Sequence, residues 1–502
     1  MLPPTFGLLI DGWTIDSEHY NGVYVLWTSN GVAKKYLLSC NVIEDVDEET
    51  DFVDQYEGER AVGFSAADWC DVLCICLNDE DIGVDIDPNS FAHIVEFIAA
   101  DNCSTNQRLC TDLAVPMVGC NSHRLHLEIE GFIGPKEKKN ARSVVIREES
   151  RLRGLIRKLD RLMGELKSLK NAALLRTQTL LLPERKNDTR WYSLFKMLLK
   201  WSKISHAVSS VESFPRSVLE LIPTAAENLE LHSLLEDLKV FESVSQALQR
   251  DGQGSKSMVS MEGVRALFDG LVDKFAQKDQ VSLSLTLSLI LSMILSLILS
   301  MILSLILSII LSLILSMTLS LILSITLSLI LSMTLSLIQV IGSHIKPGSD
   351  VVHSPDFENG IVKIQGFAEN TLTDAEKRAV KIFLIEGEQI EEEDTQDLGF
   401  ADQLLASTSS RKKAKTSAYR DTRHVHPTTN LLERLFSRCK LNMTALRKKM
   451  DPDSLDMLMF LKANKELWPD AKSVQHLLDS LTPGDWANTL VEDEEEEAFE
   501  EW

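Results

Sequence analysis

This sequence of 502 residues lacks several features that define common classes of protein. Its eight cysteines include no C-x2-C pair, so we expect no disulfide framework but reduced thiols in an intracellular protein. The first residues, Met1–Pro4, carry no basic segment ahead of an apolar run, so no secretory signal peptide is expected. An excess of positive charge is also missing. The 51 Lys and Arg against 74 Asp and Glu give a net charge of −23, which argues against a protein that coats nucleic acid.

One long segment, residues 281–338, lacks any charged residue, glycine or proline over 58 positions. It repeats a four-residue unit close to Ser-Leu-Ile-Leu. As a single helix it would be about 87 Å long, nearly three bilayer thicknesses, and it contains no residue that would turn it at a membrane surface. We interpret it as a short DNA repeat that expanded and is translated in frame. A membrane-embedded segment and an aggregation-prone β segment are the alternatives.

The chain as a whole has a globular composition, with 44% hydrophobic and 25% charged residues, and its length allows two or three domains. Charge is unevenly distributed. Residues 44–59 carry nine carboxylates in sixteen positions, whereas residues 136–203 carry 19 Lys and Arg against 7 Asp and Glu. Leucines at steps of three and four over residues 152–169 predict a long amphipathic helix with a basic outer face. Helical patterns continue over residues 205–279.

The first 130 residues alternate between β-rich and helical patterns, which is typical of an α/β protein. We predict helices over residues 66–77 and 104–113, a turn around Asn30-Gly31, and strands over residues 5–10, 23–27, 35–42, 91–99 and 115–118.

Two acidic residues follow predicted strands. Asp11 closes the first strand and Asp101 closes the fourth. If these two strands are parallel neighbours, their carboxyl ends place both carboxylates at one rim of the sheet. Two such oxygen donors with a third carboxylate suit Mg²⁺ or Mn²⁺, and two such ions support phosphoryl transfer. An Asp after a strand is also ordinary turn chemistry, so this pattern alone leaves both interpretations open.

Five short motifs follow one another along the chain, and two of them start at these Asp residues. They are DGWT (11–14), DNCSTN (101–106), CNSHRLHL (120–127), TRWYS (189–193) and NLLERLFS (430–437).

Together these motifs resemble the transposases of the hAT superfamily, over residues 5–200 and about 428–470. The resemblance implies a ribonuclease-H-like core, with a mixed sheet flanked by helices, a mostly helical insertion and a C-terminal helical segment. It implies that Asp11, Asp101 and Glu433 are the catalytic triad and bind Mg²⁺ or Mn²⁺ for cleavage and joining of DNA strands. The implied partners are DNA at transposon ends and further copies of this chain, bound as a homodimer or larger homo-oligomer through residues 428–480, with no small-molecule substrate. The implied location is the nucleus.

Two further pairs of residues match elements of the family. Cys120 and His123 match its C-x-x-H element, and Arg190 and Trp191 match an R-W element, so the resemblance implies DNA contacts for all four. Stacking of a DNA base on an indole contributes roughly 1–3 kcal/mol. The residues alone also allow a strand-end thiol, a capped histidine, a core tryptophan and, for Glu433, an exposed helical glutamate. We expect no zinc site, because no further Cys/His pair stands at ligand spacing.

Three departures from the family pattern indicate an N-terminally truncated copy with impaired activity. No room for a BED-type zinc finger precedes residue 5, His126 stands where the family commonly has Asn, and the uncharged repeat falls inside the insertion. A protein that keeps only DNA contact and dimerisation, without enzymatic activity, is an alternative. A membrane protein anchored by residues 281–338 is another.

These expectations divide the chain into six segments. Within the segment 339–427, the basic cluster 411–415 is either a nuclear import signal or an ordinary loop. The six are the first part of the core (1–133), the basic helical region and insertion (134–280), the repeat (281–338), an acidic or polar linker (339–427), the dimerisation segment completing the core (428–480) and an acidic tail (481–502).

Overall fold

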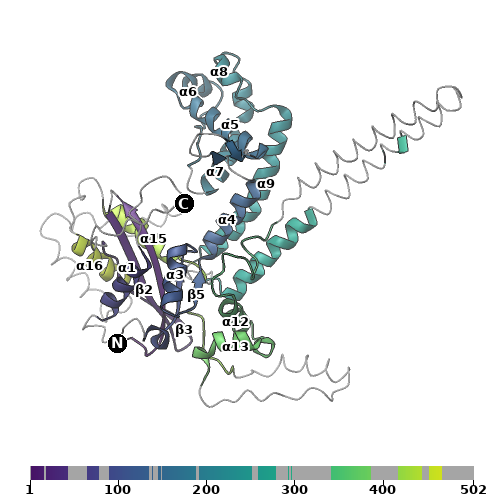
Figure 1. Ribbon diagram of the computed structural model, residues 1–502. Helices are drawn as coiled ribbons and strands as arrows, with labels where there is room; N and C mark the ends of the chain where they lie inside the picture. The colour runs from purple at the N-terminus through teal and green to yellow at the C-terminus, as the bar shows by residue number, and fades with distance from the viewer. Residues whose placement is uncertain are drawn as a thin grey trace. The chain divides into compact units, whose positions relative to one another are not determined.

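The structure, a computed structural model, divides into two compact units (Figure 1). Unit 1 comprises Met1–Ser122, Leu248–Val264 and Asp350–Trp502, and unit 2 comprises His123–Ala247 and Arg265–Ser349. The residues that the structure describes are 2–15, 18–42, 65–78, 90–134, 150–187, 191–250, 258–278, 341–385, 417–443 and 452–465, with short pieces at 138–139, 145–147, 292 and 295–296.

Unit 1 is built on a mixed five-stranded sheet in the order β3-β2-β1-β4-β5. The first three strands pair antiparallel, whereas β4 runs parallel to β1, and β5 runs parallel to β4. The first and fourth strands are therefore parallel neighbours, which meets the condition for Asp11 and Asp101 to share one rim, and the α/β class is confirmed. The strands are β1 (Phe6–Ile15), β2 (Glu18–Ser29), β3 (Val32–Ser39), β4 (Val95–Ala100) and β5 (Met117–Gly119).

The strand boundaries differ from the predicted ones, and two of the differences concern the end of β1 and the start of β4. β1 does not end at Asp11 but continues to Ile15, because it pairs with β2 along its whole length, including a pair between Asp11 and Gly22. The predicted strand over residues 91–99 begins instead with one helical turn, α2 (Phe91–Ile94), and only then becomes β4. Short apolar runs do not distinguish a buried helical turn from a buried strand, which explains the second error.

The β2–β3 hairpin turns at Asn30-Gly31, as predicted, with φ angles of 51° and 72°. Positive φ at both turn residues is the geometry of the tight hairpin turn that Asn-Gly favours.

We expect Gly31→Ala to lower the free energy of unfolding by about 1–2 kcal/mol, because a Cβ at positive φ is strained. Urea denaturation measures this. Gly12→Ala is the control, since it places its Cβ no closer than 3.8 Å to another group at a residue without positive φ; equal losses for the two variants would contradict the prediction.

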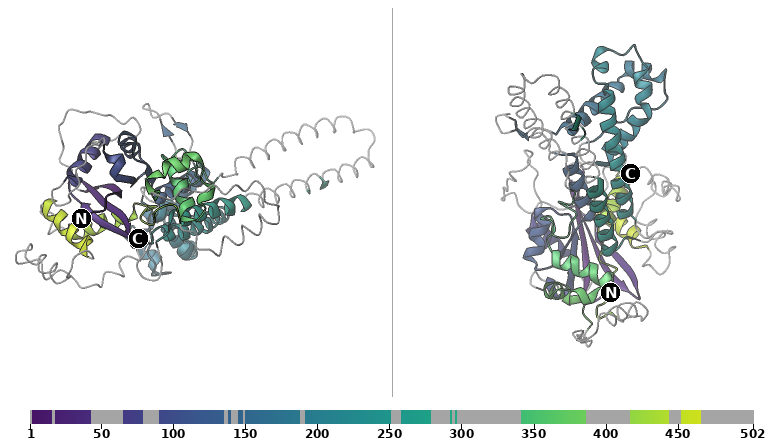
Figure 2. Two further views of the ribbon diagram at one scale, coloured as in Figure 1. Left: turned by 90° about the horizontal axis from the view of Figure 1, so that it is seen from below. Right: turned by 90° about the vertical axis from the view of Figure 1, so that its right-hand side faces the viewer.

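Helices cover both faces of this sheet, and alternating residues of β1 divide between them. Leu8 and Ile10 face one side and Leu9 the other, in keeping with the two-residue period of a strand. The Leu8 side packs on α2 and on α1 (Ala66–Leu77) and α3 (Ser104–Asp112), which match the two predicted helices. The Leu9 side packs on α12 (Pro355–Gln365), α15 (Asn430–Asn442) and α16 (Pro452–Ala463), the last two drawn in yellow beside the sheet in Figure 2.

The linker predicted over residues 339–427 is corrected for its described residues. Phe357, Ile361 and Phe383 are buried against the sheet, so the described residues from 350 onward belong to unit 1, whereas residues 341–349 belong to unit 2. Its elements are too short to produce a long helical period, so the sequence pattern hides them. Besides α12, they are the 3-10 turns η1 (Glu369–Thr371) and η2 (Lys381–Phe383) and the helix α13 (Asp374–Ala379).

Unit 2 is mostly helical, as the patterns over residues 205–279 predict, with one short antiparallel pair of strands, β6 (Lys138–Lys139) and β7 (Val145–Arg147). Its core includes three phenylalanine rings, Phe132, Phe241 and Phe275, with centroids 5.1–5.5 Å apart. Its helices are α4 (Asn121–Ile133), α5 (Arg151–Leu166), α6 (Leu169–Arg176), α7 (Trp191–Ser209), α8 (Arg216–Leu219), α9 (Ala225–Leu248) and a helix over residues 261–278.

The long amphipathic helix predicted over residues 152–169 is shorter in the structure. α5 ends at Leu166, where Lys167 and Ser168 make a turn before α6. Leu155, Leu159, Leu162 and Leu166 are buried, but Leu169 is 92% exposed. Continuation of a leucine pattern therefore does not show that a helix continues.

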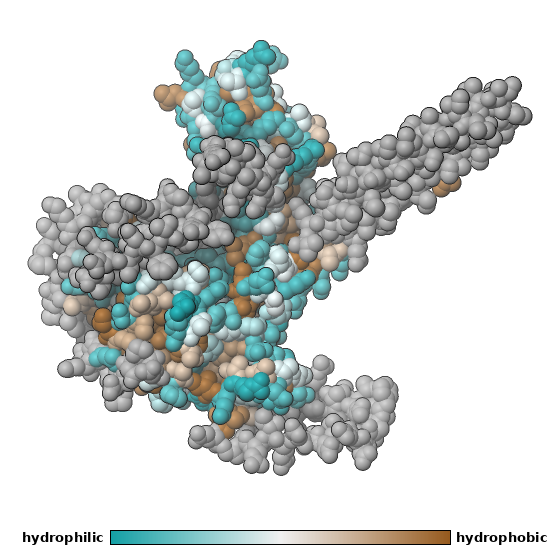
Figure 3. All heavy atoms as spheres, in the orientation of Figure 1, coloured by the Kyte–Doolittle hydropathy of each residue, from teal (hydrophilic) through white to brown (hydrophobic). Residues whose placement is uncertain are grey.

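Figure 3 shows that hydrophobic residues reach the surface among hydrophilic ones on the face in view.

Several predictions lie outside the described residues. They concern nearly all of the uncharged repeat, the acidic segment 44–59, the basic cluster 411–415, the part of the dimerisation segment after residue 465, and the acidic tail. Among the helices that are described, none has both the length and the apolar character needed to cross a membrane.

Candidate functional site

The parallel pairing of β1 with β4 brings Asp11 and Asp101 to one face of the sheet. Leu9 pairs with Ala99, and each Asp follows its member of this pair by two residues. Because side chains alternate along a strand, both Asp residues share the face of Leu9 and Ala99. Trp13, two residues beyond Asp11, packs in the same cluster as Leu9 and supports this assignment.

α15 lies on this face and carries Glu433. A Cβ on Gly22, the β2 residue paired with Asp11, would approach Leu432 within 2.5 Å and the Phe436 ring within 3.0 Å. α15 therefore lies directly over the strand pair that holds Asp11. Glu433 follows Leu432 along this helix and is half-buried. The fold thus returns the third predicted carboxylate to the face of the other two, across more than 300 residues of sequence.

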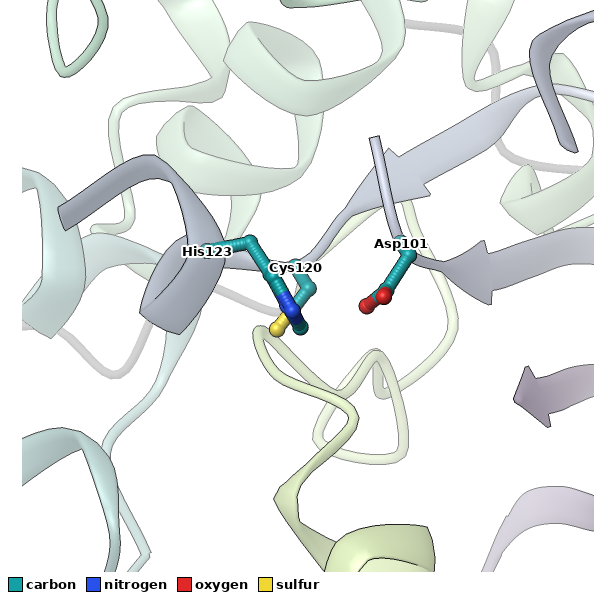
Figure 4. A group of neighbouring side chains, drawn as sticks. All are labelled: Asp101, Cys120 and His123. Carbon is teal, nitrogen blue, oxygen red and sulfur yellow. The ribbon is translucent and has the colours of Figure 1, made fainter. Parts of the chain in front are cut away.

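A second set of side chains gathers at the ends of β4 and β5. Ala100 pairs with Gly119, so the next residues along, Asp101 and Cys120, lie at the same edge of the sheet. α4 begins immediately afterwards, at Asn121, and its first turn carries His123. Ligand atoms of Asp101, Cys120 and His123 all lie within 4.8 Å of one another, and Figure 4 shows the three side chains pointing toward one another. The C-x-x-H element is thus brought together with a predicted catalytic Asp.

The predicted triad is less compact than this group. Among the described residues, the set of three His, Cys, Asp or Glu side chains that approach within 4.8 Å contains Asp101 but neither Asp11 nor Glu433. Asp11 Oδ1 accepts a hydrogen bond of 2.9 Å from the Gly12 amide. The structure therefore gathers the triad on one face of the sheet, without closing it into a cluster.

Thr429 joins the group of Asp101, Cys120 and His123, and sequence reasoning missed it. This residue is fully buried at the N-cap of α15, yet its side chain makes no capping hydrogen bond to that helix. Its Oγ1 lies instead 3.4 Å from Asp101 Oδ1 and 3.3 Å from Cys120 Sγ, and it can donate its single proton to one of them at a time. Its backbone N–H donates to Cys120 Sγ at 3.4 Å. The only sequence signal is its place directly before the last motif.

Two asparagines fix the backbone around this group. Asn121 donates to the Pro427 carbonyl twice, from its backbone N at 3.0 Å and from Nδ2 at 2.8 Å, which holds the segment before Thr429 against the end of β5. Asn102 Nδ2 donates to the Cys120 carbonyl at 3.0 Å. A Cβ on Gly119 would lie 1.9 Å from Asn102 Oδ1, so only glycine fits there in this arrangement. Both asparagines belong to the motifs, although the sequence assigned them no role.

Comparisons with known proteins do not name this site. A scan against protein-family models and a search of curated proteins both give no match.

The described part of the R-W element, Trp191, belongs to unit 2. Trp191 is the first residue of α7 and is only 8% exposed, with its ring against Tyr192 and Phe195. This burial is the core position that the residues alone allow, and little of the indole surface is open to a DNA base. Arg190 lies outside the described residues.

Acidic partners offset part of the positive charge of residues 136–203. A hydrogen bond from Lys158 is the main cause that lowers the pKa of Glu227. A surface for DNA phosphates needs cations that are not already paired, so these four residues contribute less to it than their charges suggest. The pairs within unit 2 are Arg151–Glu230, Arg153–Glu130, Lys158–Glu227 and Arg185–Asp160, with N···O distances of 2.5–2.9 Å.

Proposed function

We propose that this chain is a hAT-type transposase, or a remnant of one, with a ribonuclease-H-like core that binds, cleaves and joins DNA strands with reduced activity. Asp11, Asp101 and Glu433 are the proposed catalytic carboxylates. Residues 428–480 are the proposed surface for homodimers or larger assemblies, and the nucleus is the proposed location. Cys120 and His123 contact the DNA near the carboxylates in this proposal.

The sheet of unit 1 supports the proposed core. Such a core requires its first and fourth strands to be parallel neighbours, so that two carboxylates share one rim, and β1 and β4 have this relation. Open α/β sheets bind their ligands at the carboxyl ends of parallel strands. Asp101 and Cys120 both stand at such ends, on β4 and β5.

The observation that carries the proposal is the return of α15 to the sheet. Residues 123–247 intervene as a separate helical unit, yet α15 packs over β1 and β2 beside Asp11. The contact from Thr429 to Asp101 fixes the start of this helix at the end of β4. Glu433, on this helix, is half-buried.

The proposed ions are Mg²⁺ or Mn²⁺, and the donor set suits them, because both ions prefer carboxylate oxygens. Asp11, Asp101 and Glu433 would hold them. Two bound ions would activate the attacking oxygen and stabilise the leaving oxygen in phosphoryl transfer. The chain itself positions the carboxylates: the β1–β4 register aligns Asp11 with Asp101, and the packing of Leu432 on Gly22 sets the position of Glu433.

Incubating the full chain with a labelled DNA hairpin tests the proposal. We expect weak nicking that requires Mn²⁺ or Mg²⁺ and falls to the background of DNA alone in Asp101→Ala. Asp112→Ala is the matched control, because Asp112 is an exposed carboxylate at the end of α3 that pairs with Arg108 on the same helix. Equal nicking by Asp101→Ala and the unmodified chain would contradict the proposal. Binding of the hairpin without any nicking would favour the non-enzymatic alternative.

A further inference from the structure

The group formed by Asp101, Cys120 and His123 has a composition that differs from the predicted triad. A thiol and an imidazole are softer ligands than carboxylates and favour zinc and similar transition metals over Mg²⁺. We propose that these three side chains bind a zinc-class divalent ion, with its fourth position open. This proposal does not rest on the proposed function, because it needs only the three ligands and not DNA cleavage.

The geometry is close to what such an ion requires. Ligand atoms bonded to zinc at roughly 2.0–2.3 Å in a tetrahedron lie about 3.5 Å from one another. The ligand atoms of the three side chains are already within 4.8 Å of one another, so a closure of about 1 Å by side-chain rotation completes the site. Cys120 is buried, whereas Asp101 and His123 are half-buried, which leaves a path for an ion to enter.

The surroundings also match those of a metal ligand. Ligating groups in proteins are oriented by hydrogen bonds from neighbouring residues. Thr429 supplies these bonds to two of the three ligands: its N–H donates to Cys120 Sγ, and its hydroxyl lies between Cys120 Sγ and Asp101 Oδ1. A threonine at the start of a helix usually caps it through its side-chain oxygen. The Thr429 hydroxyl makes no such hydrogen bond to α15, and its contacts with the proposed ligands explain why.

The third ligand is not apparent from the sequence, for a topological reason. Cys120 and His123 stand at ligand spacing on their own, and no second Cys/His pair follows. Asp101 precedes Cys120 by 19 residues and reaches this pair only because β4 and β5 are parallel neighbours. Asp101 is also a proposed ligand of Mg²⁺ or Mn²⁺. When a zinc-class ion is bound here, Asp101 is therefore not available to bind Mg²⁺ or Mn²⁺ with Asp11 and Glu433.

Titration of the full chain with Co²⁺, after removal of metals by a chelator, tests the site. We expect a thiolate-to-cobalt charge-transfer band in the near ultraviolet and the intense visible bands of tetrahedral cobalt. Zn²⁺ should bleach both, since it binds such sites more tightly than Co²⁺, and excess Mg²⁺ should not. Absence of the charge-transfer band would overturn the proposal.

Variants assign the ligands. Cys120→Ser should abolish the charge-transfer band, while Cys110→Ser, at another buried cysteine of unit 1, should retain it. His123→Asn should weaken Co²⁺ binding at least tenfold, while His126→Asn, one turn along α4, should leave it unchanged. Thr429→Val should weaken it by about 10–100-fold, the usual cost of losing a hydrogen bond to a metal ligand.

Circular dichroism establishes that each variant folds. If Cys120→Ser does not fold, His123→Asn keeps the test decisive, because it preserves the sulfur and removes only the imidazole. A Co²⁺ spectrum and affinity unchanged in His123→Asn would overturn the proposal. So would a charge-transfer band that survives in Cys120→Ser.

Discussion

Replacing Glu96 by alanine is expected to lower the free energy of unfolding by about 3 kcal/mol, through the loss of a buried ion pair. Glu96 lies in β4 and is 2% exposed. Its Oε2 lies 2.7 Å from His424 Nε2, and its Oε1 accepts hydrogen bonds from Arg420 at 2.9 Å and from Thr5 at 2.7 Å. Without the carboxylate, His424 loses a buried partner. The expected loss is at the low end of the range for buried pairs, because the Arg420 side chain is 42% exposed and can be solvated.

The same carboxylate predicts how the variant depends on pH. Burial alone raises the pKa of Glu96, but the hydrogen bond and charge of His424, with Thr5 and Arg420, outweigh burial and lower the pKa overall. A carboxylate whose pKa is lower in the folded than in the unfolded chain stabilises the fold above the unfolded pKa, which is about 4.3 for Glu. That contribution is lost as the pH falls below this value. The difference in stability between the unmodified chain and Glu96→Ala should therefore be full at pH 7 and shrink below about pH 4.

Urea denaturation at several pH values, with hydrogen exchange of the β4 amides as a local probe, measures both effects. Asp112→Ala is the matched control, because the Arg108–Asp112 pair is exposed and joins residues four apart on one helix. Such a solvent-exposed pair contributes little to stability. A loss for Glu96→Ala as small as for Asp112→Ala would show that the buried contacts do not stabilise unit 1.

Much of the sheet could be predicted from the sequence, because apolar runs and turn residues mark its strands locally. The Asn30-Gly31 turn marks the hairpin, and the strand–strand–strand–helix–strand order predicts the pairing of β1 with β4. The boundaries at Asp11 and Phe91 could not be predicted, since they depend on pairing with β2 and on packing against other helices. The helices α12 and α13 were not predicted for a similar reason. Their few buried residues pack on a sheet that is distant in sequence, so the local sequence does not reveal them.

The candidate site shows the same division between local and distant information. The motifs contain Asp101, Cys120 and His123, and the resemblance assigned each of them to a site. The sequence did not indicate that these three meet, because their meeting depends on the β4–β5 register. Thr429 was missed because its hydroxyl acts on residues more than 300 positions away. A threonine before a helix predicts a cap, and here the tertiary contacts override that local preference.

The packing of α15 on the sheet leads to the second prediction, Gly22→Val, which is expected to cost about 2–3 kcal/mol of unfolding free energy by overpacking. Valine is otherwise favoured in a strand, so an effect of this sign must come from the neighbours. A Cβ at Gly22 would lie 2.5 Å from Leu432 Cδ2 and 3.0–3.2 Å from the Phe436 ring, and the two added methyl groups would push α15 from the sheet.

Because Glu433 moves with α15, Gly22→Val should also reduce any Mn²⁺-dependent nicking, although Gly22 is not itself a proposed ligand. Gly12→Val is the control on the adjacent strand, where the nearest group to a Cβ is 3.8 Å away, and we expect a change within about 0.5 kcal/mol. Adding Leu432→Ala to Gly22→Val removes the clashing methyl groups. The double variant should then be more stable than the sum of the two single losses predicts, by about 1 kcal/mol or more in a double-mutant cycle. Strict additivity would mean that α15 does not rest on Gly22, and the placement of Glu433 beside Asp11 would lose its structural basis.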